Sequence, residues 1–496
     1  MRTVVVLMIS LTLALTALAQ SSSHDPTWWD KFLFLANNGP DSLRSTVTSR
    51  IAETNVDVSN ECGPQSETFI AINPSNPKQL AAGSNEIFRL PMRAYFSSDG
   101  GKTWGGVDVP LPPSIGTNGF DFGSDPGVAF DSSNNLFYSF IVVFFANGVG
   151  QSIKGTEMAV ARSTDGGRTW PQVAFFDFNG GTNHFNDKPM IAADANLNSP
   201  FRDSIYVAWD AASGGSPGGG VRFGRSRDHG ATFTTSRIDD PNGPGRSIGA
   251  TVTTGPDGQL YVAWNDIAAN TITFNSSFDG GVTFGTPRVI AAKAVPFDIA
   301  IPAEFNRRAL VYPACDVDRT AHGPFRGRIT CAWMDLTPDG QDTDIFASFS
   351  DDQGATWAAR FSVAESLGGV DRFNHWLATD PVTGQVNVSY YDTRNDSTGG
   401  NFETDVFLSR SPDGLHFAPS LRVTDAKSNE HDCNGLFPCP SINYGNQQGD
   451  YEGIAAFGGI VHAIWTDSRR NQERAGDPSC GRGRGIMEEV FTAALK

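Results

Sequence analysis

Beyond its first 20 residues, the sequence has no apolar run that approaches the roughly 20 residues a membrane-spanning helix needs. It has no His-Glu-x-x-His, Cys-x-x-Cys or P-loop pattern, so neither a zinc site nor a nucleotide-phosphate site is indicated. It is also short of basic residues, because 37 Lys and Arg face 54 Asp and Glu and the net charge is −17. That balance argues against nucleic acid as a general partner, since phosphate binding needs a basic surface.

The first residues have the order of a secretory signal. Arg2 precedes an apolar run from Val4 to Ala17, and Ala17-Leu18-Ala19 forms an A-x-A cleavage site. We therefore expect a soluble, monomeric chain without a membrane span, secreted or held in a periplasm. The predicted division is 1–19 (signal peptide), 20–53 (N-terminal extension) and 54–496 (one folded domain).

Six cysteines in an exported chain indicate disulfides rather than a metal site, and six cysteines allow fifteen pairings. Spacing favours one pair that closes a small loop and one that flanks a hairpin. The two remaining cysteines, if paired, would tie the ends of the domain together. These pairs are Cys433–Cys439, Cys315–Cys331 and Cys62–Cys480.

What the sequence does contain is a repeated octapeptide. Ser97–Trp104 and Ser163–Trp170 both read Ser-x-Asp-x-Gly-x-Thr-Trp. Related copies stand at Ser226–Phe233, Ser277–Phe284 and Ser350–Trp357, with a shorter, degenerate one at Ser411–Phe417. Self-similarity at a period of roughly 60 residues is typical of solenoids and propellers.

The motif predicts a hairpin turn between two strands. Each copy follows a short apolar run, such as Ala94–Phe96 or Ile345–Ala347, and ends on a large aromatic residue. The Asp carboxylate can accept hydrogen bonds from backbone N–H groups two residues on, which forms an Asx-type turn. The Gly supplies the positive φ that such a turn needs.

This motif resembles the Asp-box, or BNR, repeat of the sialidase-like β-propellers. The resemblance covers essentially residues 60–496. It implies that each box is a structural turn remote from the active site, and it makes an exo-α-sialidase-like glycoside hydrolase the first function to consider.

The residues between the boxes divide into units with three recurrent strands ahead of each box. The first strands are expected at 69–72, 127–130, 190–193, 249–252, 310–312, 376–378 and 453–456. The second strands are expected at 80–83, 136–142, 205–209, 260–264, 329–333, 386–390 and 461–465. Seven units from six boxes predict a seven-bladed β-propeller, whose last blade is completed by an N-terminal strand at 54–58. Because the family's sialidases have six blades, six blades with an irregular end are the alternative.

Strand direction then sorts the side chains between two faces. In a four-stranded antiparallel blade, the first and third turns lie on one face, whereas the second turn and the links between blades lie on the other. The Asp boxes are third turns, so the starts of the first strands and the ends of the second strands are expected on the opposite face, near the axis. Acids and amides recur there, at Glu67, Asp125, Asp187, Asp210, Asn265-Asp266, Asp335, Asn374-His375, Asp392, Asp450-Tyr451-Glu452 and Asp467.

Three interpretations of this face compete. Each acid can be a local device that caps a loop, with the Arg of Asp392-Thr393-Arg394 or Asp467-Ser468-Arg469 paired to it. The face can be an exo-glycosidase site, in which guanidinium groups grip an acidic sugar while paired carboxylates act as acid and as base or nucleophile. Oxygen-rich loops also suit Ca²⁺, although hydrolysis requires no cofactor.

The resemblance supplies candidate roles. A sialidase-type site uses a Tyr activated by a Glu, and Tyr451 beside Glu452 is the nearest such pair. Phe88-Arg89-Leu90-Pro91 resembles the family's FRIP motif, whose Arg binds the sialate carboxylate, but here it follows the second strand instead of opening the first. The candidate catalytic residues are Asp392, Asp450, Tyr451, Glu452 and Asp467, and the candidate substrate-binding residues are Arg89, His375, Arg394 and Arg469.

We therefore predict a secreted, sialidase-like glycoside hydrolase that acts on glycan termini, with its site on the face opposite the Asp boxes. Two alternatives use the same face. One is a non-catalytic propeller that binds glycan or protein, and the other is a polysaccharide lyase or endo-acting hydrolase.

Overall fold

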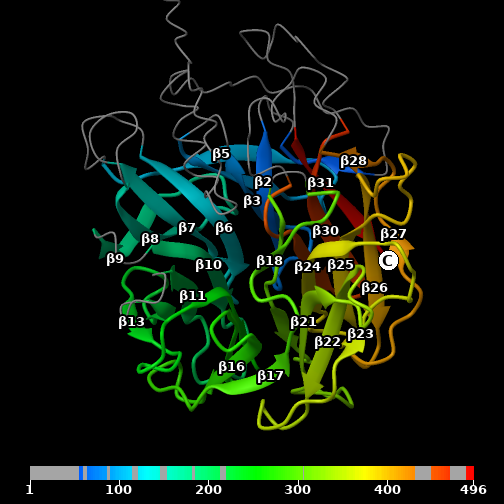
Figure 1. The fold of residues 1–496 in the computed structure, drawn as a ribbon. Coiled ribbons are helices and arrows are strands. Elements are labelled where there is room, and N and C mark those ends of the chain that lie inside the picture. Colours follow the sequence, from blue (N-terminus) through cyan, green and yellow to red (C-terminus); the bar gives the residue numbers. More distant parts are fainter. Residues whose placement is uncertain are drawn as a thin grey trace, which may run out of the picture.

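A computed structural model describes residues 55–59, 64–86, 90–113, 121–145, 153–180, 185–212, 219–304, 307–430, 448–469 and 488–496. Every regular element in these ranges is a β-strand. Seven antiparallel sheets follow one another around a ring in sequence order (Figure 1). Each has a path of four strands, and in blade 6 a fifth strand, β28 (Ser428–Asn429), also pairs with the third strand of the path. The prediction of an all-β, seven-bladed propeller is confirmed, and the six-bladed alternative is wrong.

Within each blade the strands run outwards from the axis. Blade 1 contains β2 (Gln65–Ile72), β3 (Leu80–Glu86), β4 (Met92–Ser97) and β5 (Gly105–Val109). Blade 2 contains β6 (Phe122–Phe130), β7 (Leu136–Phe145), β8 (Ile153–Ser163) and β9 (Gln172–Asn179). Blade 3 contains β10 (Phe185–Ala193), β11 (Ile205–Ala212), β12 (Gly220–Ser226) and β13 (Thr234–Arg237). Blade 4 contains β14 (Ser247–Thr254), β15 (Leu260–Asp266), β16 (Thr271–Ser277) and β17 (Arg288–Ala292). Blade 5 contains β20 (Ala314–Val317), β21 (Ile329–Leu336), β22 (Thr343–Ser350) and β23 (Phe361–Ser362). Blade 6 contains β24 (Arg372–Thr379), β25 (Val386–Asp392), β26 (Glu403–Ser411) and β27 (Leu421–Arg422). Blade 7 contains β29 (Gly453–Phe457), β30 (Ile460–Asp467), β31 (Glu489–Leu495) and β1 (Val56–Asp57).

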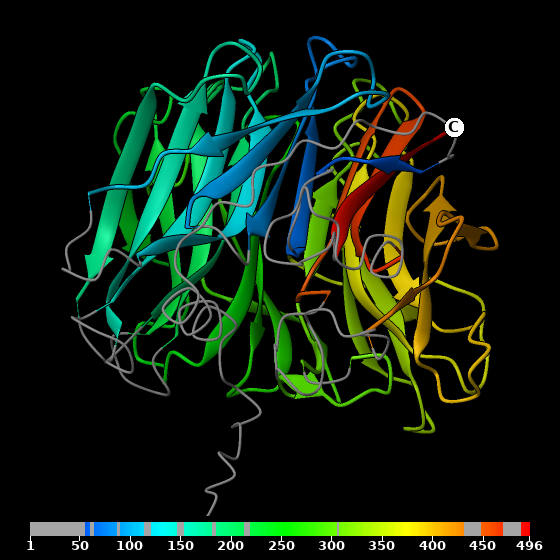
Figure 2. The same cartoon turned by 90° about the horizontal axis from the view of Figure 1, so that it is seen from above.

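The ring is closed by the strand nearest the N-terminus. β1 pairs with β31, as predicted for an N-terminal strand that completes the last blade. The register is Val56↔Thr492 and Asp57↔Phe491. Figure 2 shows this blue strand lying across the red β31. The Val58 amide extends the ladder by donating a hydrogen bond of 2.7 Å to the carbonyl of Val490. Blade 7 thereby combines three strands from the C-terminal part of the chain with one strand from the N-terminal part.

The fifth blade departs from the prediction. Residues 310–312 were expected to form its innermost strand, but that strand is β20 (Ala314–Val317). β19 (Ala309–Leu310) pairs instead with β18 (Asp298–Ile299) in the link between blades 4 and 5. The predicted Cys315–Cys331 disulfide is present and joins register partners of β20 and β21. The other four cysteines lie outside the described residues.

The Asp boxes form the turns between the third and fourth strands. In the copy that follows β16, the Ser277 hydroxyl donates to the carboxylate of Asp279 at 2.8 Å and accepts the Gly281 amide at 3.0 Å. The carboxylate also accepts the amide and hydroxyl of Thr283, at 2.9 and 2.7 Å, so it reaches four residues along the chain instead of two. Burial raises the pKa of Asp279, but these hydrogen bonds outweigh burial and lower it to about 2.

The second strands supply the largest buried side chains. Trp209, Trp264, Trp333 and Trp465 end the repeated apolar runs of β11, β15, β21 and β30, and each is at most 1% exposed. They pack between neighbouring blades, which makes the blade interfaces the hydrophobic core. Within the described ranges, no helix is long and apolar enough to cross a membrane.

The closing strand is expected to contribute to global stability. Val58 is 3% exposed and packs in a cluster with Ile70, Ile464 and Val490 from blades 1 and 7. Val58→Ala should lower the free energy of unfolding in urea by about 1–3 kcal/mol, because it removes buried apolar surface and leaves a cavity. Val282→Ala, at a position that is 54% exposed, should change it by less than about 0.5 kcal/mol. Equal effects of the two variants would contradict this role.

Candidate functional site

Near the axis, β-bulges interrupt the innermost strands just after their start. The pairing register shifts within blades 1, 2, 3, 4 and 6, and each shift contains a residue with positive φ. These residues are Glu67 (54°), Asp125 (61°), Lys188 (47°), Gly249 (70°) and Asn374 (44°). Four of the five are not glycine, so the backbone is strained there. Bulges re-aim side chains, and strain of this kind concentrates at functional sites.

Three carboxyl groups share hydrogen bonds at this end of the axis. Asp125 is hydrogen-bonded to both Glu67 and Asp187. Burial, and then the neighbouring carboxyl groups, raise the pKa of Glu67 and of Asp187 well above the usual values. The Asn85 amide fixes the group by donating to Glu67 at 2.6 Å and by accepting the Asp125 amide at 2.7 Å. Both shifts favour the protonated forms of Glu67 and Asp187, and we call Glu67, Asp125 and Asp187 the carboxyl chain.

A tyrosine and a carboxylate lie beside the carboxyl chain. The Tyr312 hydroxyl donates to Asp450 at 3.1 Å, and Arg307 forms an ion pair with the same carboxylate. Arg307 also lies 3.9 Å from Glu67, so one guanidinium links Asp450 to the carboxyl chain. Burial, followed by the charge of Asp450, raises the pKa of Tyr312 well above its usual value. We call Glu67, Asp125, Asp187, Lys188, Arg307, Tyr312, Asp450 and Tyr451 the axial site.

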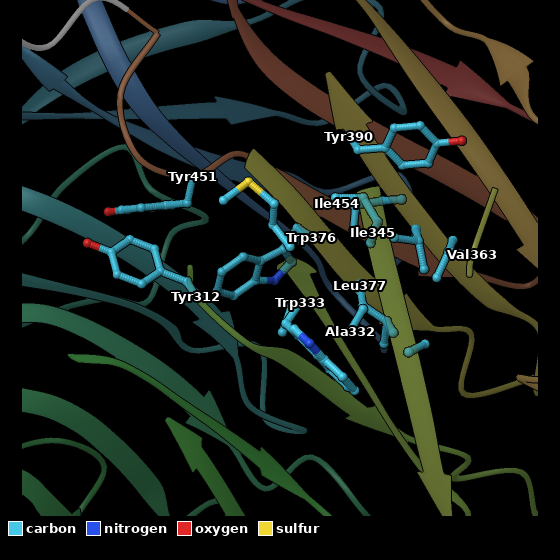
Figure 3. Packing of buried hydrophobic residues seen from close by; sticks show 14 of the residues in the cluster. Tyr312, Ala332, Trp333, Ile345, Val363, Trp376, Leu377, Tyr390, Tyr451 and Ile454 are labelled. Atoms are coloured by element: carbon cyan, nitrogen blue, oxygen red, sulfur yellow. The ribbon is translucent and has the colours of Figure 1, made fainter. Parts of the chain in front are cut away.

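Lys188 occupies an aromatic cage at the base of the axial site. Its ammonium lies 3.9 Å from the ring centroid of Tyr451, 4.5 Å from that of Tyr312 and 4.9 Å from that of Trp376. The three rings are grouped together in Figure 3. Within the described part of the chain, the ammonium has no hydrogen-bond partner. Burial lowers the pKa of Lys188 to about 8, although the nearby carboxylates, Asp210 first among them, oppose this shift.

Two of the predicted catalytic residues, Asp450 and Tyr451, belong to the axial site, whereas Glu452 faces other partners. The Tyr451 hydroxyl lies 3.5 Å from the carbonyl of Pro126. The carboxyl group of Glu452 accepts the Tyr391 hydroxyl at 2.6 Å and the Thr466 amide at 3.0 Å. The tyrosine–carboxylate pair of the axial site is therefore Tyr312 with Asp450, and not Tyr451 with Glu452 as the sequence suggested. Catalytic roles for these residues stay predictions.

The two Asp-x-Arg loops form separate ion pairs. Asp392 is fully buried and binds both Arg394 and Arg372. Arg394 also binds Glu365 and covers the ring of Phe407.

In blade 7, Asp467 accepts the Trp465 indole N–H and binds Arg469. Arg469 also binds Asp425 and covers the ring of Phe491. Arg394 and Arg469 thus have different partners, and the arrangement matches the interpretation of these loops as local structural devices. Their role in substrate binding is untested.

The remaining predicted residues have different outcomes. His375 is 4% exposed, and burial, its largest influence, lowers its pKa to about 4, so its imidazole is neutral at pH 7. Arg89 lies outside the described residues. Among the residues that are described, no three His, Cys, Asp or Glu side chains are arranged to hold a metal ion.

The sequence analysis missed Lys188, Arg307 and Tyr312. Lys188 follows Asp187 directly and is brought to the axis because it lies within the bulge between Asp187 and Met190. Arg307 and Tyr312 come from the link between blades 4 and 5, where no repeat motif marks a position. The apolar run Leu310–Tyr312 predicts a strand, and a strand there gives no sign that Tyr312 belongs to the axial site.

Glu452 should make folding stability depend on pH. Burial raises its pKa to about 8, although hydrogen bonds from Thr68 and Tyr391 lower it in part. In the unfolded chain a Glu titrates near a pKa of about 4.3, so the folded chain holds a proton that the unfolded chain releases. This contribution to stability is full at low pH and is lost as the pH rises through the window to about 8.

Glu452→Gln, which cannot ionise, should therefore lose stability less steeply over this window, by up to about 1.4 kcal/mol per pH unit. Urea unfolding between pH 5 and 8 measures the difference. Glu365→Gln is the matched control, because the pKa of Glu365 is about 2 and the group stays ionised throughout. Parallel curves for wild type and Glu452→Gln would refute the proposed protonation.

Comparison with known proteins finds similarity in architecture only. No family model matches the sequence, and no curated protein matches it. Among solved structures, the Hadza microbial sialidase Hz136 is 16% identical over 71% of this chain and 72% of that chain, with a TM-score of 0.46. A leech intramolecular trans-sialidase, complexed with 2,7-anhydro-Neu5Ac, is 12% identical over 79% and 71%, with a TM-score of 0.45.

A Penicillium chrysogenum alpha-L-arabinanase complexed with arabinobiose is 13% identical over 64% of this chain and 95% of that chain, with a TM-score of 0.39. Because all three TM-scores lie below 0.5, nothing about the chemistry of this chain follows from these similarities.

Proposed function

We propose that this protein is a glycoside hydrolase whose active site is the axial site, on the face opposite the Asp boxes. The observation that carries the proposal is the presence, at one end of the axis, of hydrogen-bonded carboxyl groups with raised pKa values beside a tyrosine–carboxylate pair. Glycoside hydrolysis needs an acid that is protonated at neutral pH and a nucleophile or base that is not. The axial site brings candidates for both together, with Arg307 between Asp450 and the carboxyl chain.

Asp187 is the proposed general acid. Its pKa is raised by burial and by Asp125, and it is only partly buried, so its proton can reach a bound sugar. Glu67 has a similarly raised pKa but is 2% exposed, which suits a proton reservoir behind Asp187. In the first step Asp187 gives its proton to the leaving glycosidic oxygen.

Tyr312 and Asp450 form the proposed nucleophilic pair. Asp450 already accepts the Tyr312 hydrogen bond and would take the phenolic proton as the oxygen attacks the anomeric carbon. In the second step Asp187, now ionised, takes a proton from water. That water displaces the tyrosine, and Asp450 returns its proton to Tyr312. Arg307 and Lys188 stabilise negative charge on the phenolic oxygen during both steps.

The finer hypothesis is an exo-sialidase that acts on glycan termini. Such an enzyme needs guanidinium groups to bind the sugar carboxylate, and Arg307 is a partly exposed guanidinium in the axial site. We keep Arg89, His375, Arg394 and Arg469 as proposed substrate contacts, and Asp392 and Asp467 as proposed catalytic or supporting acids. Arg394→Ala and Arg469→Ala test these roles, with circular dichroism to detect loss of folding where a buried aspartate becomes unpaired.

A non-catalytic glycan-binding propeller is the second candidate. The raised pKa of Tyr312 favours it, because a phenol that ionises reluctantly is a poor nucleophile. Binding without turnover on a glycan array would support this alternative.

Export is also proposed. The Cys315–Cys331 disulfide supports an oxidising compartment, because cytosolic thiols are kept reduced.

Turnover of fluorogenic glycosides tests the hydrolase. Wild type should release 4-methylumbelliferone from at least one member of a panel that includes the N-acetylneuraminide. Asp187→Asn and Tyr312→Phe should each lower kcat at least about 100-fold, because each removes a proton-transfer or nucleophilic group. Tyr390→Phe is the matched control, since this buried tyrosine bonds to Ser409 in blade 6 and should keep full activity. Full activity of Tyr312→Phe would exclude the proposed nucleophile.

A further inference from the structure

The β-bulge of blade 4 differs from the other four. In blades 1, 2, 3 and 6, the bulge residue with positive φ has a charged or polar side chain: Glu67, Asp125, Lys188 and Asn374. Blade 4 has Gly249 at this position, with a φ of 70°. Its bulge therefore supplies no side chain, and another part of the chain can occupy the space that a side chain would fill.

Tyr312, from the link between blades 4 and 5, occupies that space. A Cβ atom on Gly249 would lie 2.3 Å from Cδ1, 2.9 Å from Cγ and 3.2 Å from Cβ of Tyr312. Because Cγ and Cβ stay in place when the ring turns about its own axis, such a turn does not relieve the overlap. The backbone of Gly249 is held as well, since its amide donates a hydrogen bond to the fully buried Asp210 carboxylate. A larger residue at position 249 would therefore displace Tyr312.

A displacement of Tyr312 would weaken its contacts in the axial site. Its hydroxyl donates to Asp450 at 3.1 Å, and its ring centroid lies 4.5 Å from the Lys188 ammonium. The preceding residue, Val311, is anchored through its carbonyl, which accepts the side-chain amide of Asn265 at 3.0 Å. These contacts hold the link, the ring and the hydroxyl, and Gly249 leaves the room in which the ring fits.

We propose that Gly249 is a positioning residue of the axial site. The absence of a side chain in the fourth bulge places the Tyr312 ring beside Lys188 and its hydroxyl on Asp450. The importance of this placement for turnover rests on the proposed function, in which Tyr312 is the nucleophile. The steric relation between Gly249 and Tyr312 does not depend on any activity.

A double-mutant cycle measured by urea unfolding tests the steric relation. Gly340→Ala is the matched control, because Gly340 also has a φ of 70° but a Cβ atom there meets nothing within 4 Å. Both substitutions strain the backbone, and only Gly249→Ala adds an overlap. Gly249→Ala should raise the equilibrium constant of unfolding at least about tenfold more than Gly340→Ala does. In the Tyr312→Ala background this excess should fall below about threefold, because the ring has been removed.

An excess that is equally large with and without the ring would overturn the proposal, and so would the absence of an excess when the ring is present. If Gly249→Ala does not fold, as judged by circular dichroism, the double variant Gly249→Ala/Tyr312→Ala decides the matter. A folded double variant supports the proposal, and an unfolded one overturns it.

Turnover tests the consequence for the proposed active site. On the glycoside that wild type cleaves, Gly249→Ala should lower kcat at least about tenfold, because a small misplacement of a reacting group is costly. KM should change less than about twofold, since the substrate contacts stay in place. Gly340→Ala should keep both constants.

A wild-type kcat in Gly249→Ala would overturn the positioning role. If wild type cleaves no glycoside, the proposed function fails instead, and the unfolding cycle alone decides whether Gly249 positions Tyr312.

Discussion

The β-bulge near the start of the innermost strands is the constraint on which both ends of the axis depend. One extra residue shifts the strand register, so the side chains before and after it are presented differently to the axis. Within the bulge, charged residues such as Glu67 and Lys188 converge in the axial site. After it, alternate residues of the innermost strands face the axis, and in five blades one of them is alanine: Ala71, Ala129, Ala192, Ala378 and Ala455. Without the shift, these alanines would alternate out of the axial position.

Burial of the charged side chains in the axial site costs free energy, and the opposite charges among them offset part of this cost. Burying carboxyl groups beside one another is unfavourable, which is why Glu67 and Asp187 have raised pKa values. Arg307 and Lys188 bring two positive charges into the group, and Asn85 supplies hydrogen bonds. A network that is strained, buried and proton-sharing resembles what catalysis requires more than what stability requires. The buried tryptophans between blades and the closing β1 strand stabilise the ring that carries this network.

Most of the architecture was predictable because it repeats. Six copies of one turn and the recurrent apolar–aromatic second strands identify seven blades, and the face opposite the boxes follows from strand direction. The innermost strand of the fifth blade was predicted wrongly because Leu310–Tyr312 is as apolar as a strand. These residues belong instead to the link between blades 4 and 5, which places Tyr312 in the axial site. Repeats cannot reveal residues in links, which is why Arg307 was missed. Adjacency in the sequence was also a poor guide to pairing, because Tyr451 and Glu452 are neighbours in the chain but contact different partners.

The proposed function depends most directly on Glu67 and Asp187 being protonated at neutral pH, as a proton donor and its reservoir must be. Infrared difference spectroscopy at pH 7, comparing wild type with Glu67→Gln and with Asp187→Asn, measures this directly. The account predicts that each variant loses a band of a protonated carboxyl group that wild type shows. Difference spectra that contain only the bands of ionised carboxylates would contradict it.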